Sequence, residues 1–233
     1  MTTAVSLAGA DQSLRCGRFS REGAPNATSR TAGHALARFE QINQLVKSSS
    51  YSIVFFGDSL TEGWDPAAWQ QKMAPRGVLN AGVSGDRTDH LLWRLEHGNL
   101  AGPTPKAIIL AIGTNDLGSG RSPEASADGI RANLALLRQR LPSVRMLLLG
   151  LLPREEFPGA PLRRAVERVN ALIRDCADDN HVFFAEIGGA LLDSSGRLGT
   201  TISPDHLHLS ERGYALLAKQ LAPILDGLIA DTQ

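Results

Sequence analysis

Residues 54–64 read VFFGDSLTEGW, and the pattern of the whole chain can be worked out from this stretch. The apolar run over residues 53–56 predicts a buried strand, and Gly57, Asp58 and Ser59 interrupt it. A serine or aspartate at this place commonly caps the helix that follows a strand. A serine at the carboxyl edge of a parallel sheet also has the position of a nucleophile, because α/β proteins bind ligands at that edge. The stretch alone leaves both interpretations of Ser59 open.

The rest of the chain repeats this order of strand, turn and helix. Apolar runs predict further strands over residues 78–80, 107–112, 144–152 and 182–184. Helical periodicity, together with capping residues and Pro at helix starts, predicts helices over residues 34–46, 67–73, 88–98, 123–140, 162–177 and 211–229. The alternation is typical of an α/β fold, in which a parallel sheet is covered by helices on both faces.

Length and composition indicate a single domain. The chain has 233 residues, of which 42% are hydrophobic, and this suits one domain with a well-developed core. Residues 1–33 are rich in Ser, Thr, Ala, Gly and Arg without a sustained apolar period, and they are interpreted as an irregular N-terminal arm. We therefore expect one catalytic domain over residues 34–233.

Charge and hydropathy exclude several classes of partner. Acidic and basic residues balance at 24 each, so no net field attracts nucleic acid, and motifs for binding nucleic acid are absent. The chain has no run of about 18 apolar residues, so no membrane span is predicted. The first residues lack the pattern of a signal peptide, which favours the cytoplasm. A secreted form whose signal has been removed stays open.

The two cysteines, Cys16 and Cys176, form no metal or redox motif and are too few for a disulfide framework. Cys176 continues the apolar stripe of Val166, Val169 and Ile173, so it is predicted to be a core residue. Cys16 falls in the irregular arm and is predicted to be a free thiol.

Short polar stretches lie at the exits of three of the predicted strands. Residues 57–59 read GDS, residues 84–86 read SGD and residues 113–116 read GTND. The exits of parallel strands lie at one edge of the sheet, so we expect the three loops to converge. Each loop alone is typical of a turn, but three together indicate a site.

A fourth stretch, SPDHLHLS over residues 203–210, offers Asp205, His206 and His208. An acid three residues before a histidine can meet it within one turn of the chain. Asp205 would then accept the ring N–H of His208, and the other ring nitrogen would act as a base for Ser59. His206 is interpreted as a spectator or a residue at the pocket rim.

Attack of Ser59 on an ester would place negative charge on the carbonyl oxygen, so hydrogen-bond donors are needed there. The backbone N–H groups of Ser59 and Gly85 and the side-chain amide of Asn115 are the candidates on the converging loops. Loss of one such donor typically costs roughly 100- to 1,000-fold in rate.

Four stretches, FFGDSLTEGW, NAGVSGDRTDHLLWRLEHG, GTND and DHLHLS, resemble the four blocks of the SGNH (GDSL) hydrolases. They occur in that family's order and together cover about residues 50–225. The second block is most similar to that of the catalytic subunits of platelet-activating factor acetylhydrolase and their bacterial esterase relatives.

The resemblance implies a flavodoxin-like, three-layer α/β/α fold with five parallel strands in the order 2-1-3-4-5. It implies Ser59 as nucleophile, Asp205 and His208 as the rest of the triad, and Gly85 and Asn115 in the oxyanion hole. It also implies a small-molecule acetyl-type ester as substrate and a possible homodimer. The mechanism requires no cofactor and no metal.

Two alternatives compete with a serine esterase. One is a metal-dependent phosphoesterase, although the chain lacks an upstream Asp-x-His and a His in GTND. Its candidate ligands would be Asp58, Asp86, Asp89, Asn115, Asp116, His206 and His208. The other is a non-catalytic flavodoxin-like binding module with Ser59 as a cap, but such a module does not explain why Asp205 and His208 accompany the three polar loops.

Overall fold

A computed structural model describes residue 16, residues 26–30 and residues 33–230 of the chain. Most of the predicted N-terminal arm, residues 1–15, 17–25 and 31–32, lies outside the described residues. The division of the chain into an arm and one catalytic domain stays a prediction.

The centre of the fold is a five-stranded sheet in the order β2-β1-β3-β4-β5, and every pairing is parallel. This confirms the expected topology. Gly57 at the end of β1 lies beside Gly82 of β2 and Ala111 of β3, so these strands end at the same level. Their exits therefore share one edge of the sheet. The strands are β1 (Ile53–Gly57), β2 (Val78–Gly82), β3 (Ala107–Ala111), β4 (Arg145–Leu149) and β5 (Val182–Ala185).

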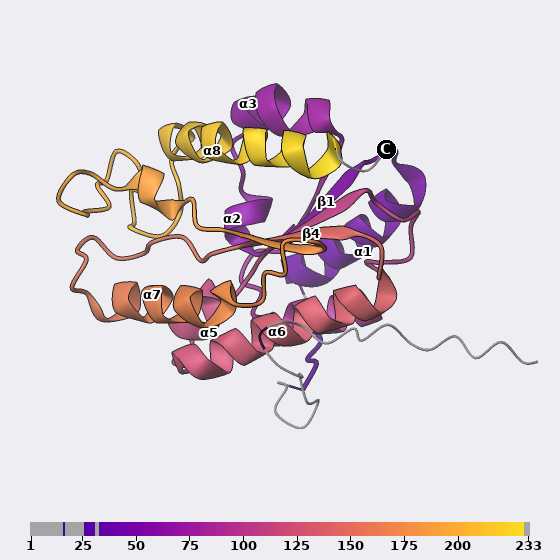
Figure 1. The fold of residues 1–233 in the computed structure, drawn as a ribbon, viewed down its shortest axis with the longest axis horizontal. Helices are drawn as coiled ribbons and strands as arrows, with labels where there is room; N and C mark the ends of the chain where they lie inside the picture. The colour runs from indigo at the N-terminus through magenta and orange to yellow at the C-terminus, as the bar shows by residue number, and fades with distance from the viewer. Residues whose placement is uncertain (1–15, 17–25, 31–32, 231–233) are drawn as a thin grey trace, which may run out of the picture.

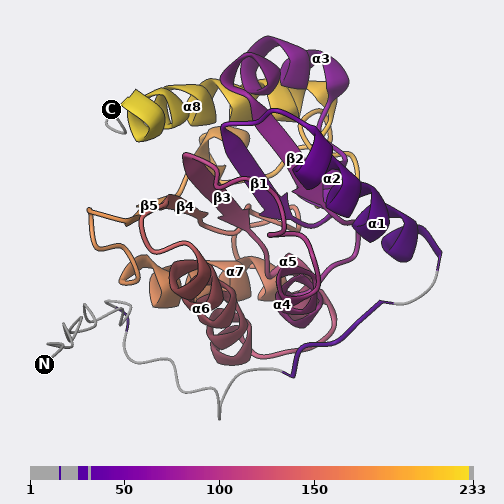
Figure 2. The ribbon, with the colours of Figure 1, turned by 90° about the vertical axis from the view of Figure 1, so that its right-hand side faces the viewer.

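Helices cover both faces of the sheet, which gives the predicted three layers (Figures 1 and 2). The core on one face contains side chains of α1 (Gly33–Ser48), α4 (Thr88–Glu96), α6 (Pro123–Arg140) and α7 (Pro161–Arg174). The opposite face is covered by α8 (Glu211–Ala230) and α3 (Pro66–Ala68). In the described part of the chain, no helix has both the length and the apolar character needed to cross a membrane.

The strand side chains alternate between two cores. Val54 and Phe56 of β1 belong to the core under α4 and α6, whereas Ile53 and Phe55 belong to the core under α8. All four are at most 3% exposed. Burial on both faces explains why the strand is continuously apolar, since neither face of a doubly covered parallel sheet meets water.

Some predicted elements differ in extent. The predicted helix 67–73 is a short α3 followed by a π-helical turn (Trp69–Met73) and a 3-10 turn (Ala74–Arg76). Gly77, with φ +63°, ends this segment. The predicted strand 144–152 ends at Leu149, and the predicted helix 162–177 ends at Arg174. Two short helices at strand exits, α2 (Ser59–Glu62) and α5 (Thr114–Gly118), were not predicted, because a single turn is too short to show a helical period.

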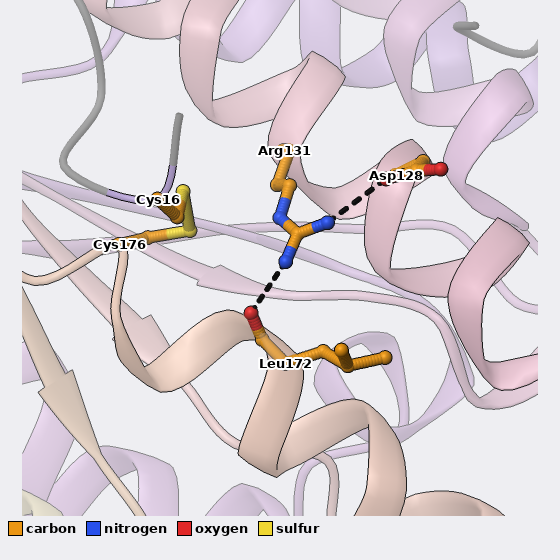
Figure 3. Close-up of a disulfide and its surroundings, with 5 residues drawn as sticks. All are labelled: Cys16, Asp128, Arg131, Leu172 and Cys176. Atoms are coloured by element: carbon orange, nitrogen blue, oxygen red, sulfur yellow. Dashed lines mark hydrogen bonds and ion pairs between the residues drawn. A yellow bond between two sulfur atoms is a disulfide. The ribbon is translucent and has the colours of Figure 1, made fainter. Parts of the chain in front are cut away.

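The prediction that Cys16 is a free thiol is wrong, because Cys16 forms a disulfide with Cys176 (Figure 3). Cys176 is fully buried just beyond α7, as expected of a core residue. Beside the disulfide, Arg131 of α6 donates to the carbonyl oxygen of Leu172 at 2.6 Å. A separation of 160 residues carries no local pattern, so spacing could not reveal this pairing.

Replacing Cys16 with serine is expected to lower the free energy of unfolding by about 2–4 kcal/mol, because the disulfide restricts the unfolded chain. Urea unfolding of the wild type and the Cys16→Ser variant measures the difference. Dithiothreitol should destabilise the wild type by a similar amount and leave the variant unchanged. Equal unfolding midpoints for the oxidised wild type and the variant would contradict this prediction.

Candidate active site

The turn that carries Ser59 joins β1 to α2. Asp58 is the N-cap of α2, and its Oδ1 accepts a hydrogen bond from the backbone N–H of Leu60 at 3.0 Å. Asp58 therefore holds the loop through a hydrogen bond between its side chain and the backbone. Since Asp58 supplies the cap, the Ser59 hydroxyl is left for another partner.

Two glycines let α2 pack directly on the ends of the strands. A Cβ atom at Gly82 would lie 2.3 Å from the backbone N of Glu62, and one at Gly57 would lie 2.0 Å from Thr61 Oγ1. Any larger residue at either position would push α2 away. This close approach places Ser59 at the carboxyl edge of the sheet, which is the edge where α/β folds bind ligands.

The structure brings Ser59, His208 and Asp205 into one hydrogen-bonded chain. Ser59 Oγ lies 3.1 Å from His208 Nε2, and His208 Nδ1 lies 2.7 Å from Asp205 Oδ2. Asp205 Oδ1 also accepts from the backbone N–H groups of His208 at 2.7 Å and Leu207 at 3.0 Å. The tight turn expected from the spacing of Asp205 and His208 is therefore present. It places His208 beside Ser59, which lies 149 residues earlier in the sequence.

The environment keeps Asp205 ionised. Burial raises the pKa of this carboxyl, but hydrogen bonds from the His208 ring and from the backbone of His208 and Leu207 outweigh it and lower the pKa to about 2. An ionised Asp205 accepts a hydrogen bond from Nδ1 of His208, which orients the ring so that Nε2 faces the Ser59 hydroxyl. This is the arrangement of a general base beside a nucleophile.

Each of the three candidate oxyanion donors has an N–H hydrogen that is available to bind an oxyanion. Among the described residues, neither the backbone N–H of Ser59 nor that of Gly85 donates to a protein acceptor. The amide of Asn115 donates one hydrogen to the carbonyl oxygen of Asp86 at 2.9 Å, and its second hydrogen is available. Gly85 adopts φ +79°, a conformation that favours glycine.

A buried arginine that was not predicted from the sequence anchors the loop that carries Gly85. Arg94 of α4 is 3% exposed, and its Nε donates to Asp86 Oδ2 at 2.7 Å. The signal was present, because Arg94 interrupts the apolar stripe of Leu91 and Leu95. A charged residue on a buried stripe requires a charged or polar partner.

The loop after β3 is anchored by a second buried carboxylate. Asp116 accepts hydrogen bonds from the backbone N–H of Thr88 at 2.9 Å, the Thr88 hydroxyl at 2.7 Å and Arg121 at 2.7 Å. Asp116 therefore holds its loop through a hydrogen bond between its side chain and the backbone. Asn115, the neighbour of Asp116, is thereby fixed relative to α4.

The candidate ligands of the phosphoesterase alternative do not form a cluster. Within residues 26–30 and 33–230, no three His, Cys, Asp or Glu side chains are grouped so as to hold a metal ion. Asp86 and Asp89 are paired with Arg94 and Arg87, at 2.7 and 3.0 Å. His206 faces the carbonyl oxygen of Leu198 through Nδ1 at 2.9 Å. The arrangement therefore supports a serine nucleophile better than a metal site.

Asp58 has the opposite electrostatic environment to Asp205. Complete burial, with the nearby charges of Asp86 and Asp116, raises its pKa to about 7, although the hydrogen bond from Leu60 opposes the shift. Asp58 is therefore protonated in the folded protein at mildly acidic pH and ionised in the unfolded chain above its ordinary pKa of 3.8. Its contribution to stability is lost as pH rises through about 7.

Between about pH 5 and pH 8, this group should lower the free energy of unfolding by about 2 kcal/mol. The Asp58→Asn variant keeps an oxygen for the Leu60 N–H but cannot ionise, so its stability should fall less over the same range. Urea unfolding of both proteins at the two pH values isolates the contribution of Asp58. An identical pH dependence for the two proteins would show that Asp58 does not titrate in this way.

A family model and several curated proteins match most of the length of this chain. The model of the GDSL-like Lipase/Acylhydrolase family matches residues 55–216. The platelet-activating factor acetylhydrolase IB subunit alpha1 of Pongo abelii is 36% identical over 189 residues, which cover 80% of each chain. The alpha2 subunit of Rattus norvegicus is 34% identical over 188 residues, which cover 80% of this chain and 81% of that protein.

Two solved structures have similar folds. A Streptococcus pneumonia protein, provisionally named a platelet activating factor, is 27% identical with a TM-score of 0.72, over 82% of this chain and 92% of its own. An acetyl-xylooligosaccharide esterase mutant from Geobacillus Stearmophilus is 20% identical with a TM-score of 0.61, over 77% and 96% of the two chains. From the family match and the curated relatives, the chain belongs to the GDSL-like lipase/acylhydrolase family and is a carboxylic ester hydrolase.

Proposed function

We propose that the protein is a serine esterase that hydrolyses short-acyl carboxylic esters through an acyl-enzyme on Ser59. The observation that carries this proposal is the hydrogen-bonded chain from Asp205 through His208 to the Ser59 hydroxyl. Chains of this kind activate a hydroxyl that is otherwise a weak nucleophile at neutral pH.

In the first step, Ser59 Oγ forms a bond to the ester carbonyl carbon while His208 Nε2 accepts the hydroxyl proton. Asp205 stabilises the imidazolium that results, and it keeps the ring oriented through the bond to Nδ1. The carbonyl π electrons move to oxygen. Their charge is held by the N–H groups of Ser59 and Gly85 and by the Asn115 amide.

In the second step, the carbonyl re-forms and the bond to the leaving alcohol breaks. His208 gives its proton to the alcohol oxygen, which leaves an acyl group on Ser59. Water then attacks the acyl carbon with His208 again as base, and the carboxylic acid and free Ser59 are released. The chain's own residues supply every proton transfer in this sequence.

A small cavity of about 30 Å³, lined by residues on either side of Ser59 in the chain, supports a short acyl group. Asp58 and Leu60, the neighbours of Ser59, line it together with Thr114. A cavity needs about 10–15 Å³ to hold one water, so this space suits a group the size of a methyl. The names of the similar proteins, an acetylhydrolase and an acetyl-xylooligosaccharide esterase, point the same way. The other lining residues are Phe55, Thr61, Trp64, Ala111, Ile112, Leu149, Gly150, Leu151, Leu152 and Leu217.

The Cys16–Cys176 disulfide favours an oxidising compartment over the cytoplasm that the sequence favoured, since disulfides persist mainly in oxidising surroundings. Alkylation of free thiols during cell lysis tests this inference, and a labelled Cys16 or Cys176 would contradict it. The possible homodimer stays a prediction.

A fluorophosphonate, which reacts with activated serines, should form a covalent adduct on Ser59 that peptide mass spectrometry can locate. Labelling should persist in the presence of a chelator, because no step requires a metal. The His208→Asn variant should lose at least about 1,000-fold in labelling rate, since Asn cannot accept the proton.

Two matched variants control for indirect effects. His206→Asn changes the neighbouring histidine, and Asn tolerates the φ of +57° found there. Ser84→Ala removes a hydroxyl from the adjacent loop. Both should be labelled at close to the wild-type rate. Absence of an adduct on Ser59 in folded wild-type protein would overturn the serine mechanism.

A series of p-nitrophenyl esters with one leaving group tests the acyl preference. We expect kcat/KM to fall by roughly tenfold or more from acetate to octanoate, because the cavity lacks room for the longer chain. Equal kcat/KM values for the two esters would contradict a short-acyl preference and leave the role of Ser59 intact.

A further inference from the structure

The loop that carries Gly85 is held from several sides. Glu62, at the end of α2, accepts a hydrogen bond from the Ser84 N–H at 2.6 Å. Asp86 is bound through its side chain by Arg94 and through its carbonyl oxygen by Asn115. Glu62, Arg94 and Asn115 belong to the helices α2, α4 and α5. One further contact comes from a segment outside these helices.

Arg30 contacts this loop from the segment that precedes α1. Its Nη1 donates to the carbonyl oxygen of Ser84 at 2.6 Å and to Asp86 Oδ1 at 3.1 Å. A Cβ atom at Gly85 would lie 3.3 and 3.4 Å from the two terminal nitrogens of Arg30. The guanidinium therefore lies against the backbone of Gly85 and binds both of its neighbours in the chain.

The segment around Arg30 is itself attached to the domain. The backbone N–H of Thr28 donates to the carbonyl oxygen of Asp89 at 3.1 Å, which places residues 26–30 beside α4 (Figure 2). In the first turn of α1, His34 Nε2 lies 2.7 Å from Glu62 Oε1. Earlier in the chain, Cys16 is covalently bound to Cys176. Arg30 thus lies between two points of attachment.

We propose that Arg30 is a positioning residue of the active site, which holds the Gly85 N–H in the orientation that the oxyanion requires. This inference rests on the proposed function, in which Gly85 is an oxyanion donor. Glycine at φ +79° has few steric restraints of its own, so the orientation of its N–H depends on what binds its neighbours.

The physical effect should appear in the transition state. A donor that is already aimed at the developing charge lowers the barrier, whereas a mobile donor must be reoriented during the reaction. Removal of Arg30 should therefore lower kcat and leave KM nearly unchanged. Lysine at this position keeps the charge but lacks the planar group that can bind both flanking residues, so it should restore only part of the rate.

Arg87 is the matched control for Arg30. Its side chain is 29% exposed against 34% for Arg30, and each binds a buried aspartate. Arg87 pairs with Asp89 two residues away and makes no hydrogen bond to residues 84–86 among the described contacts. The Arg87→Ala variant should therefore retain close to the wild-type kcat.

Kinetics with p-nitrophenyl acetate test the proposal in full-length protein. We expect Arg30→Ala to lower kcat by roughly 10- to 100-fold, less than the loss of a donor itself, with KM changed by less than about threefold. Arg30→Lys should give an intermediate kcat, and circular dichroism should show both variants folded. Wild-type kcat in a folded Arg30→Ala variant would overturn the proposal, as would an equal loss in Arg87→Ala.

Ser59→Ala separates failure of this inference from failure of the proposed function. If Ser59→Ala abolishes hydrolysis and Arg30→Ala does not slow it, only the role of Arg30 is wrong. If Ser59→Ala hydrolyses the ester as fast as the wild type, the proposed function is wrong and the role of Arg30 is wrong with it.

Discussion

The buried carboxylate of Asp86 lies between two guanidinium groups, that of Arg94 on α4 and that of Arg30 on the segment before α1. Its backbone carbonyl oxygen meanwhile accepts the amide of Asn115. One residue thereby joins α4, the loop after β2 and the helix after β3. Removing one partner of a buried ion pair leaves an uncompensated charge, so the contacts of Asp86 are costly to break. The position of Gly85, its neighbour, depends on them.

The parallel sheet makes this arrangement possible. Because β1, β2 and β3 end at the same level, the loops that follow them share one edge of the sheet. Gly57 and Gly82 allow α2 to rest on the strands, which fixes the turn that presents Ser59. The acid Asp205 and the base His208 lie far from Ser59 in the sequence, on the loop before α8.

Hydrogen bonding and burial shift the pKa values of two aspartates near Ser59 in opposite directions. Asp205 is more than half exposed, but the His208 ring and two backbone N–H groups lower its pKa to about 2. Asp58 is 2% exposed, and although its carboxyl accepts a hydrogen bond from Leu60, burial raises its pKa to about 7. The charged form is therefore favoured at Asp205, which orients the base, and disfavoured at Asp58, the residue before the nucleophile in the chain.

The sequence by itself determined the features that depend on neighbouring residues: the alternation of strands and helices, the polar strand exits and the contact of Asp205 with His208. The order of the strands came from the resemblance to a known family, because periodicity does not state which strands pair. Only the tertiary structure decided the disulfide of Cys16 and the contact of Arg30 with Gly85. Each of these joins residues more than 50 positions apart, and such pairings leave no periodic or local signal, since folding alone brings the partners together.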